Sequence, residues 1–134
     1  MHFYISLAFF CLTAVAIADE KSPVPATAKT STELRKTIQE TSPKLLSPER
    51  IPVDFAEFNR TGRSVFLAWY CPTSGEATCR VFSYEFNETK KEWKLLREQF
   101  FRGTQDISPE FTLDLRLRFR DVRGKEIFYE PEPK

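Results

Sequence analysis

Two cysteines, Cys71 and Cys79, constrain the fold of this chain more than any other feature. Pro72 and Gly75 lie between them and favour a turn. The flanking segments, 64–71 and 79–86, are rich in the β-branched and aromatic residues typical of strands. We therefore expect a disulfide that closes a hairpin loop. A redox-active dithiol is the alternative, although such pairs usually have Cys-x-x-Cys spacing.

This disulfide would also fix which side chains face each other across the hairpin. If Cys71 lies opposite Cys79, the expected pairs are Trp69 with Val81, Ala68 with Phe82, and Phe66 with Tyr84. Both faces of the hairpin are apolar, which favours a central position in the sheet. One face carries four aromatic side chains that either pack in the core or line a pocket for an apolar ligand: Phe66, Tyr70, Phe82 and Tyr84.

The first eighteen residues have the pattern of a secretory signal peptide. They contain no Lys, Arg, Asp or Glu, and they end in Ala16-Ile17-Ala18, a small-x-small cleavage site directly before Asp19. The apolar run is too short for a comfortable membrane span, and a membrane-anchored N-terminus is the alternative. We therefore expect a secreted protein, or a periplasmic one in a bacterium, with no membrane span after cleavage. The third cysteine, Cys11, would leave with the leader.

The composition predicts a tether over residues 19–50, which are rich in Pro, Ser, Thr and Lys. A short helix over 31–40 fits within it, because Thr30 and Glu33 have capping-box spacing. Leu34 and Ile38 would share one face of that helix, which either docks on the domain or is marginal alone.

From residue 51 onward the pattern predicts an all-β domain over 51–130, followed by an extended tail over 131–134. The fold class we expect is an antiparallel meander of about six strands that forms a small sandwich or an open barrel. The clearest signal is strict alternation over 111–120, with Phe111, Leu113, Leu115, Leu117 and Phe119 on the buried face. The six expected strands are 51–56, 64–71, 79–86, 93–101, 111–120 and 126–130.

Several catalytic chemistries are excluded for the chain without its leader. Its one histidine, His2, lies in the leader, so no catalytic or metal-binding histidine would remain. If both remaining cysteines are paired, there is no thiolate nucleophile either. We expect no metal, no cofactor and no enzyme activity. A hydrolase or lyase that uses paired carboxylates is a remaining alternative, with Asp54, Glu57, Glu85, Glu92, Glu98 and Asp106 as candidates.

Charge offers one candidate binding surface. The chain has 20 basic and 19 acidic residues, so no net field favours nucleic acid or a membrane. On the polar face of the predicted strand, Arg116, Arg118 and Arg120 would form a ladder that could bind a sulfated glycan, a phosphate or an acidic partner. Alternatively, acidic residues on neighbouring strands neutralise the ladder: Glu98, Asp114, Glu126 or Glu130.

Both asparagines of the chain open a glycosylation sequon. Asn59 is followed by Arg60-Thr61 and Asn87 by Glu88-Thr89, and each is expected in a hairpin turn. The alternative is that Asn and Thr are simply common turn residues. We expect glycosylation if the source is eukaryotic, whereas in a bacterium the sequons would carry no meaning. Taken together, the sequence favours a secreted, non-catalytic binding module with a protein or glycan partner. A carrier of a small apolar ligand inside a β-barrel is the alternative.

Overall fold

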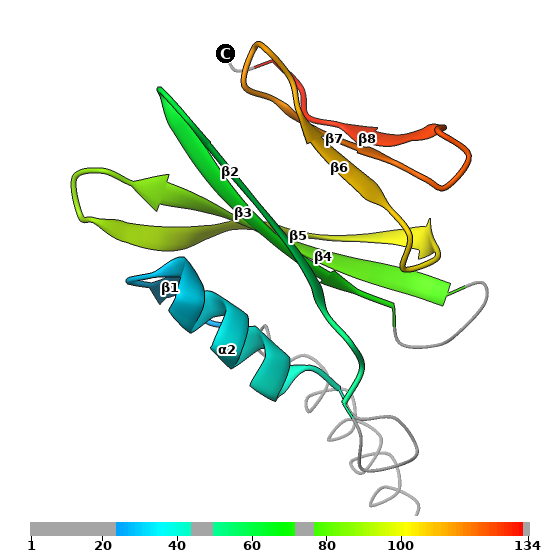
Figure 1. The fold of residues 1–134 in the computed structure, drawn as a ribbon, viewed down its shortest axis with the longest axis horizontal. Coiled ribbons are helices and arrows are strands. Elements are labelled where there is room, and N and C mark those ends of the chain that lie inside the picture. Colours follow the sequence, from blue (N-terminus) through cyan, green and yellow to red (C-terminus); the bar gives the residue numbers. More distant parts are fainter. Residues whose placement is uncertain (1–23, 44–49, 72–76, 133–134) are drawn as a thin grey trace, which may run out of the picture.

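The computed structural model describes residues 24–43, 50–71 and 77–132. It has three layers: a helix, a five-stranded antiparallel sheet and a three-stranded antiparallel sheet (Figure 1). The predicted all-β class and antiparallel meander are confirmed, and the sheets do not close into a barrel. The leader over 1–18 and the turn residues 72–76 lie outside the described residues.

The central sheet has the strand order β1-β5-β4-β3-β2. The four long strands follow one another along the chain, and their bounds are β2 Asp54–Arg60, β3 Arg63–Tyr70, β4 Ala77–Asn87 and β5 Glu92–Gly103. The predicted register of β3 and β4 is confirmed, since Phe66, Ala68 and Trp69 lie opposite Tyr84, Phe82 and Val81. The disulfide is confirmed as well, with 4.3 Å between the Cα atoms of Cys71 and Cys79.

The β4–β5 pairing contains one irregularity. Ser83 lies opposite Arg97 and Tyr84 lies opposite Leu95, so Leu96 has no partner across the ladder. This is a β-bulge, in which one strand contributes an extra residue and its side-chain alternation shifts by one position. Before the bulge Trp93 faces the helix, and after it Phe101 faces the small sheet.

Residues 24–43 are not a tether but a layer of the fold. They form β1 (Thr27–Ala28), which pairs with β5, and α2 (Ser31–Thr41), which begins after the N-cap Thr30. The Oγ1 atom of Thr30 accepts a hydrogen bond of 3.0 Å from the Glu33 amide, as the capping pattern predicts. Leu34 and Ile38 are fully buried against the sheet. The composition was misleading because two apolar side chains one turn apart suffice for docking when the sheet supplies the rest of the core.

The small sheet covers the other face of the central sheet. Its strands are β6 (Ser108–Phe111), β7 (Leu117–Arg120) and β8 (Glu126–Tyr129), in that order. The second core lies between the two sheets, and its buried members are Val65, Leu67, Trp69, Val81, Ile107, Phe111, Leu117 and Phe119.

The prediction of one strand over 111–120 was wrong. β6 ends at Phe111, and a turn reverses the chain before β7 begins at Leu117. Leu113 lies in this turn and is 95% exposed rather than buried. The alternating pattern could not reveal the turn, because the residues of the turn continue the alternation of the two strands beside it.

Candidate functional site

The four aromatic side chains of the predicted ligand face lie in the core beneath α2. Phe66, Tyr70, Phe82 and Tyr84 are at most 1% exposed, and Trp93 and Leu34 belong to the same cluster. The Tyr84 hydroxyl donates a hydrogen bond of 2.6 Å to the Pro25 carbonyl. Burial, followed by the charge of Glu98, raises the pKa of Tyr84. Segment 24–43 thus covers the face that an apolar ligand would otherwise reach.

Each arginine of the predicted ladder has an acidic partner. Arg116 pairs with Asp114 at 2.7 Å, and Arg118 lies 4.0 Å from Glu126, so two of the four proposed neutralising residues form ion pairs with the ladder. Glu110 pairs with Arg118 at 3.1 Å and with Arg120 at 3.2 Å. The sequence missed Glu110, because it lies beside Arg118 only once the chain has reversed between β6 and β7.

The acidic residues considered for catalysis do not converge on one cleft. Glu85 pairs with Arg63, Glu98 pairs with Arg80 at 3.0 Å, and Glu92 pairs with Lys29 at 3.3 Å. Asp54 accepts a hydrogen bond of 2.8 Å from Gln105. These four carboxylates therefore lie on both faces of the central sheet, each with a separate partner, and do not form a pair that could flank a substrate.

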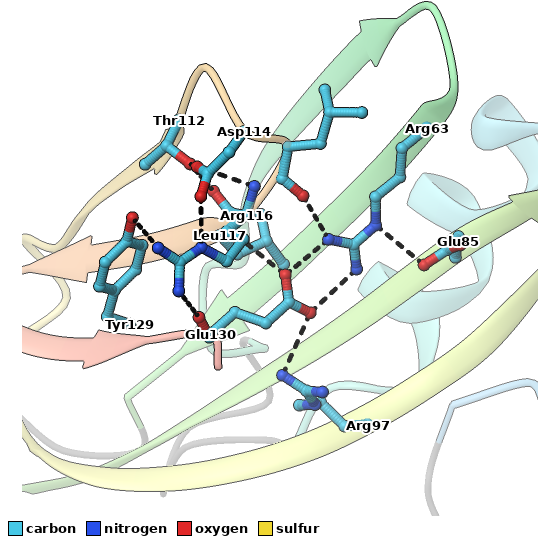
Figure 2. Close-up of polar contacts among 10 residues, drawn as sticks. Arg63, Glu85, Arg97, Thr112, Asp114, Arg116, Leu117, Tyr129 and Glu130 are labelled. Carbon is cyan, nitrogen blue, oxygen red and sulfur yellow. Dashed lines mark hydrogen bonds and ion pairs between the residues drawn. The ribbon is translucent and has the colours of Figure 1, made fainter. Parts of the chain in front are cut away.

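An ionic cluster joins the two sheets at the β2–β3 hairpin end of the sandwich (Figure 2). Arg63, at the start of β3, binds both oxygens of Glu130, which follows β8, at 2.5 and 2.9 Å. Its Nε atom donates to Glu85 of β4 at 3.0 Å, and Nη1 also donates to the Leu115 carbonyl at 2.8 Å. The two side chains are 14% and 9% exposed, so the pair is largely shielded from water. Arg63 therefore connects β3, β4, the β6–β7 turn and the chain after β8.

Glu130 receives more hydrogen bonds than any other described carboxylate in this cluster. Besides Arg63, its oxygens accept from the Leu117 amide at 3.1 Å and lie 3.4 Å from Arg97 of β5. Burial by itself would raise the pKa of Glu130. The hydrogen bonds from Arg63 and Leu117, together with the charges of Arg63 and Arg97, outweigh this effect and hold the pKa below its ordinary value.

The turn between β6 and β7 is held in a fixed shape. The Thr112 amide donates to the Arg116 carbonyl at 2.9 Å, the Arg116 amide donates to Thr112 Oγ1 at 3.1 Å, and Thr112 Oγ1 also contacts Asp114. The Thr112 hydroxyl is the largest cause that lowers the pKa of Asp114, and Arg116 adds to it. Leu115 adopts a φ of +63°, a left-handed conformation that costs a leucine about 1 kcal/mol.

Arg116 links this turn to the end of β8. Its Nη2 donates to the Tyr129 hydroxyl at 2.8 Å and its Nη1 to the Glu130 carbonyl at 3.2 Å. The guanidinium also lies 4.2 Å from the centre of the Tyr129 ring, within the range of a cation–π contact. The β6–β7 turn is therefore held by its internal hydrogen bonds and by the contacts of Arg116 with Tyr129 and Glu130.

A groove of about 590 Å³ opens between this turn and the β2–β3 hairpin. Gly62 approaches Leu115 closely, and a Cβ at this position would lie 3.4 Å from Leu115 Cδ1. The exposed side chain of Leu113 lies in the same turn as the lining residues Asp114, Leu115 and Arg116. The residues that line the groove are Gly62, Arg63, Glu85, Arg97, Asp114, Leu115, Arg116, Glu130, Pro131 and Glu132.

Sequence reasoning missed most of this site. Arg63 directly precedes the predicted apolar strand 64–71. A charged residue in that position could have been recognised as marking the start of a buried strand. Glu130 was considered only as a neutralising partner of the ladder, and Leu113 was assigned to the core. The signal for Leu113 was absent, because its exposure depends on a turn that the alternation hides.

The two sequon asparagines lie at strand ends near this groove. Asn59 is exposed within the last residues of β2, and Asn87 is the half-buried last residue of β4. The prediction placed each asparagine in a turn. The turns instead begin two residues after Asn59 and one residue after Asn87.

No helix in the described ranges is long and apolar enough to cross a membrane. Within the same ranges, no group of three or more His, Cys, Asp or Glu side chains is arranged to hold a metal ion. Comparison with family models, curated proteins and solved structures found no match to this chain.

Proposed function

We propose that this chain is a secreted, non-catalytic binding module that recognises a protein partner at the groove and at Leu113. The observation that carries the proposal is a fully exposed leucine on a turn of fixed shape. An apolar side chain that stays exposed to water contributes no hydrophobic stabilisation to the folded monomer. A strained backbone residue such as Leu115 persists only where surrounding contacts enforce it, and such residues concentrate at functional sites.

The contacts within the turn support this proposal because they prepare the site for binding. Thr112, Asp114 and Arg116 hold the turn in one conformation, so a partner would lose little entropy by ordering it. Tyr129 is held in place by Arg116 on the outer face of the same sheet. Tyrosine and arginine side chains are enriched in protein-binding surfaces, and here they lie on the same small sheet as the exposed Leu113.

The charges of the groove favour a protein partner over a polyanion. Three arginines line it together with four acidic residues, Glu85, Asp114, Glu130 and Glu132. A sulfated glycan or nucleic acid would meet four negative charges and only three positive ones there. The ladder of Arg116, Arg118 and Arg120 is likewise paired with carboxylates, which weakens the glycan alternative.

The non-catalytic and secreted parts of the proposal have separate support. General acid catalysis needs a carboxyl whose pKa is raised, whereas the pKa values of Asp114 and Glu130 beside the groove are lowered. The disulfide between Cys71 and Cys79 is of the kind that persists in oxidising compartments. The leader pattern over 1–18 points to the same compartment.

The proposal is tested with the variant Leu113→Asp and the matched control Val122→Asp. Val122 is the apolar residue of the β7–β8 turn and is 72% exposed, so the control adds the same charge to the other turn of the sheet. Purified wild-type protein and both variants are used to capture secreted and cell-surface proteins of the source, and the captured partner is then titrated by calorimetry. We expect Leu113→Asp to bind at least about tenfold more weakly, a loss of about 1.4 kcal/mol.

Two outcomes would contradict this proposal. One is the absence of any partner whose binding depends on Leu113, with Leu113→Asp and Val122→Asp giving equal affinities. The other is retention of the wild type on a heparin column that is lost when Arg116, Arg118 and Arg120 are changed together to Ser. The second result would assign the binding surface to the arginine ladder.

A further inference from the structure

We infer that Asn59 and Asn87 both carry N-linked glycans, and that the two glycans flank the groove end of the central sheet on opposite faces. This inference rests on the proposed secretion, because glycans of this type are added in the secretory pathway. It goes beyond the proposed function, since it assigns two covalent modification sites and their direction relative to the groove.

Both sequons lie beside the start of β3. Asn59 of β2 is the Cα partner of Ser64, and Glu85 of β4 is the Cα partner of Val65, with Asn87 two residues further along β4. The two asparagines therefore lie on the two strands that flank β3, at the end of the central sheet from which the β2–β3 and β4–β5 hairpins project. Figure 1 shows the β2–β3 and β4–β5 hairpins projecting from the same end of the central sheet, where their tips diverge.

Alternation along the strands places the two acceptor side chains on opposite faces. Val65 is buried between the two sheets, so its partners Phe58 and Glu85 face the same side. Asn59 follows Phe58 by one residue and thus faces the helix side. Asn87 follows Glu85 by two residues and faces the side on which Glu85 lines the groove.

The hydrogen bonds of both amides are compatible with a sugar on Nδ2. Asn87 accepts a hydrogen bond of 2.9 Å from the Lys90 amide through Oδ1, which glycosylation leaves intact. Asn59 donates from Nδ2 to Glu57 Oε2 at 3.1 Å, and a glycosylated amide keeps one N–H for this contact. Thr61 and Thr89, the hydroxyl residues of the two sequons, are both exposed.

The ordinary use of asparagine as a turn residue accounts for the contact of Asn87 with the Lys90 amide, but not for Asn59 within β2. The turn between β6 and β7 uses Asp114, and the turn between β7 and β8 uses Asp121 and Gly124. Asparagine occurs at two positions in the chain, and both are followed by threonine two residues later. The chain thus places asparagine where a sequon results and builds these other turns with aspartate.

The modification is a group transfer from a lipid-linked oligosaccharide, which a membrane transferase of the secretory pathway supplies. The Nδ2 atom attacks C1 of the first sugar and forms a C–N bond. The bond between C1 and the pyrophosphate oxygen breaks, the lipid pyrophosphate leaves, and one amide proton is lost to a base. No oxidant or reductant is required.

The test uses the full chain with its own leader, expressed in eukaryotic secretory cells and recovered from the medium. We expect wild-type protein to lose mass in two steps on digestion with peptide-N-glycosidase. Asn59→Gln and Asn87→Gln should each lose one step, and the double variant should lose both. Thr61→Ser serves as the matched control, because it keeps the sequon, whereas Thr61→Val should abolish the glycan at Asn59 only. Peptide mass spectrometry should find aspartate at 59 and 87 after digestion.

The outcomes separate this inference from the proposed secretion. Protein in the medium with neither site or only one site modified overturns the inference and leaves secretion intact. A chain that stays in the cytosol with its own leader overturns secretion. Replacing residues 1–18 with an established leader then tests the two acceptor sites directly, and an unmodified exported chain overturns the inference in that case as well.

Discussion

Arg63 and Glu130 hold the two sheets together through single side chains. The guanidinium of Arg63 satisfies both oxygens of Glu130 and also binds Glu85 and the Leu115 carbonyl. Few donors and acceptors of this pair remain for water, so the energy that burial costs is offset by directed hydrogen bonds. The same contacts form the floor of the groove that we assign to binding.

At this scale we predict a pH-dependent effect of Glu130→Gln. At pH 7 the change should lower the free energy of unfolding by about 2 kcal/mol, because it removes a charged acceptor from Arg63 and Arg97. Since the pKa of Glu130 is lowered in the folded state, its contribution is fully present above the ordinary value of 4.5 and is lost as the pH falls below it. The difference between wild type and variant should therefore shrink from pH 7 to pH 3.

Urea denaturation at a series of pH values measures this difference. Glu126→Gln is the control, because Glu126 lies 4.0 Å from Arg118 and is half-exposed, and it should change stability by less than about 0.5 kcal/mol. A gap between wild type and Glu130→Gln that stays constant down to pH 3 would contradict the role assigned to the carboxylate.

Among the elements, α2 shows how a polar segment becomes part of a core. Its sequence is mostly polar, yet Leu34 and Ile38 are fully buried over Phe66 and Trp93 of the central sheet. β1 and the hydrogen bond from Tyr84 to Pro25 fix the chain before the helix. The helix therefore completes the core on that face of the sheet.

We predict that Leu34→Ala lowers the free energy of unfolding by about 3 kcal/mol, since it leaves a cavity under a helix held by two apolar contacts. Lys36→Ala, on the exposed face of the same helix, is the control and should change stability by less than about 0.5 kcal/mol. Thermal or urea denaturation provides the measurement. Equal, small effects of both changes would mean that the helix does not contribute to the stability of the sheet.

The elements also show which parts of the fold could be predicted from the sequence. The β3–β4 register was predictable because a disulfide, a turn and two apolar strands all indicate the same pairing. The sequence predicted the helix but left its docking open, since the face that α2 covers is formed by residues distant in the sequence. The break between β6 and β7 was not predicted, because the alternation of apolar and polar residues continues through it. For the same reason, the exposure of Leu113 and the contact of Glu110 with Arg118 were not predicted.

The whole molecule has two cores that share one sheet. The helix-side core contains Trp93, and the core between the sheets contains Trp69. Residues of β3 alternate between the two cores, so neither layer can detach without exposing one face of the central sheet. This arrangement favours a single cooperative unfolding transition.

We predict that the two tryptophans report the same unfolding transition. The single-tryptophan proteins Trp69→Phe and Trp93→Phe should each show fluorescence and far-ultraviolet circular dichroism midpoints that coincide in urea, because both cores lose their shared sheet at once. Reduced stability of either variant does not affect the test, since the comparison is made within one protein. Fluorescence of Trp93 changing before the circular dichroism would show that the helix layer unfolds separately.

The bulge at Leu96 divides β5 into two halves whose inward-facing positions are out of phase by one residue. Trp93 and Phe101 are both odd-numbered, yet they serve opposite cores. The number of residues between Trp93 and Phe101 therefore determines which core each side chain enters. When homologous chains are aligned with this one, a one-residue gap placed between 93 and 101 would exchange the faces assigned to Phe100 and Phe101, even where every other column matches.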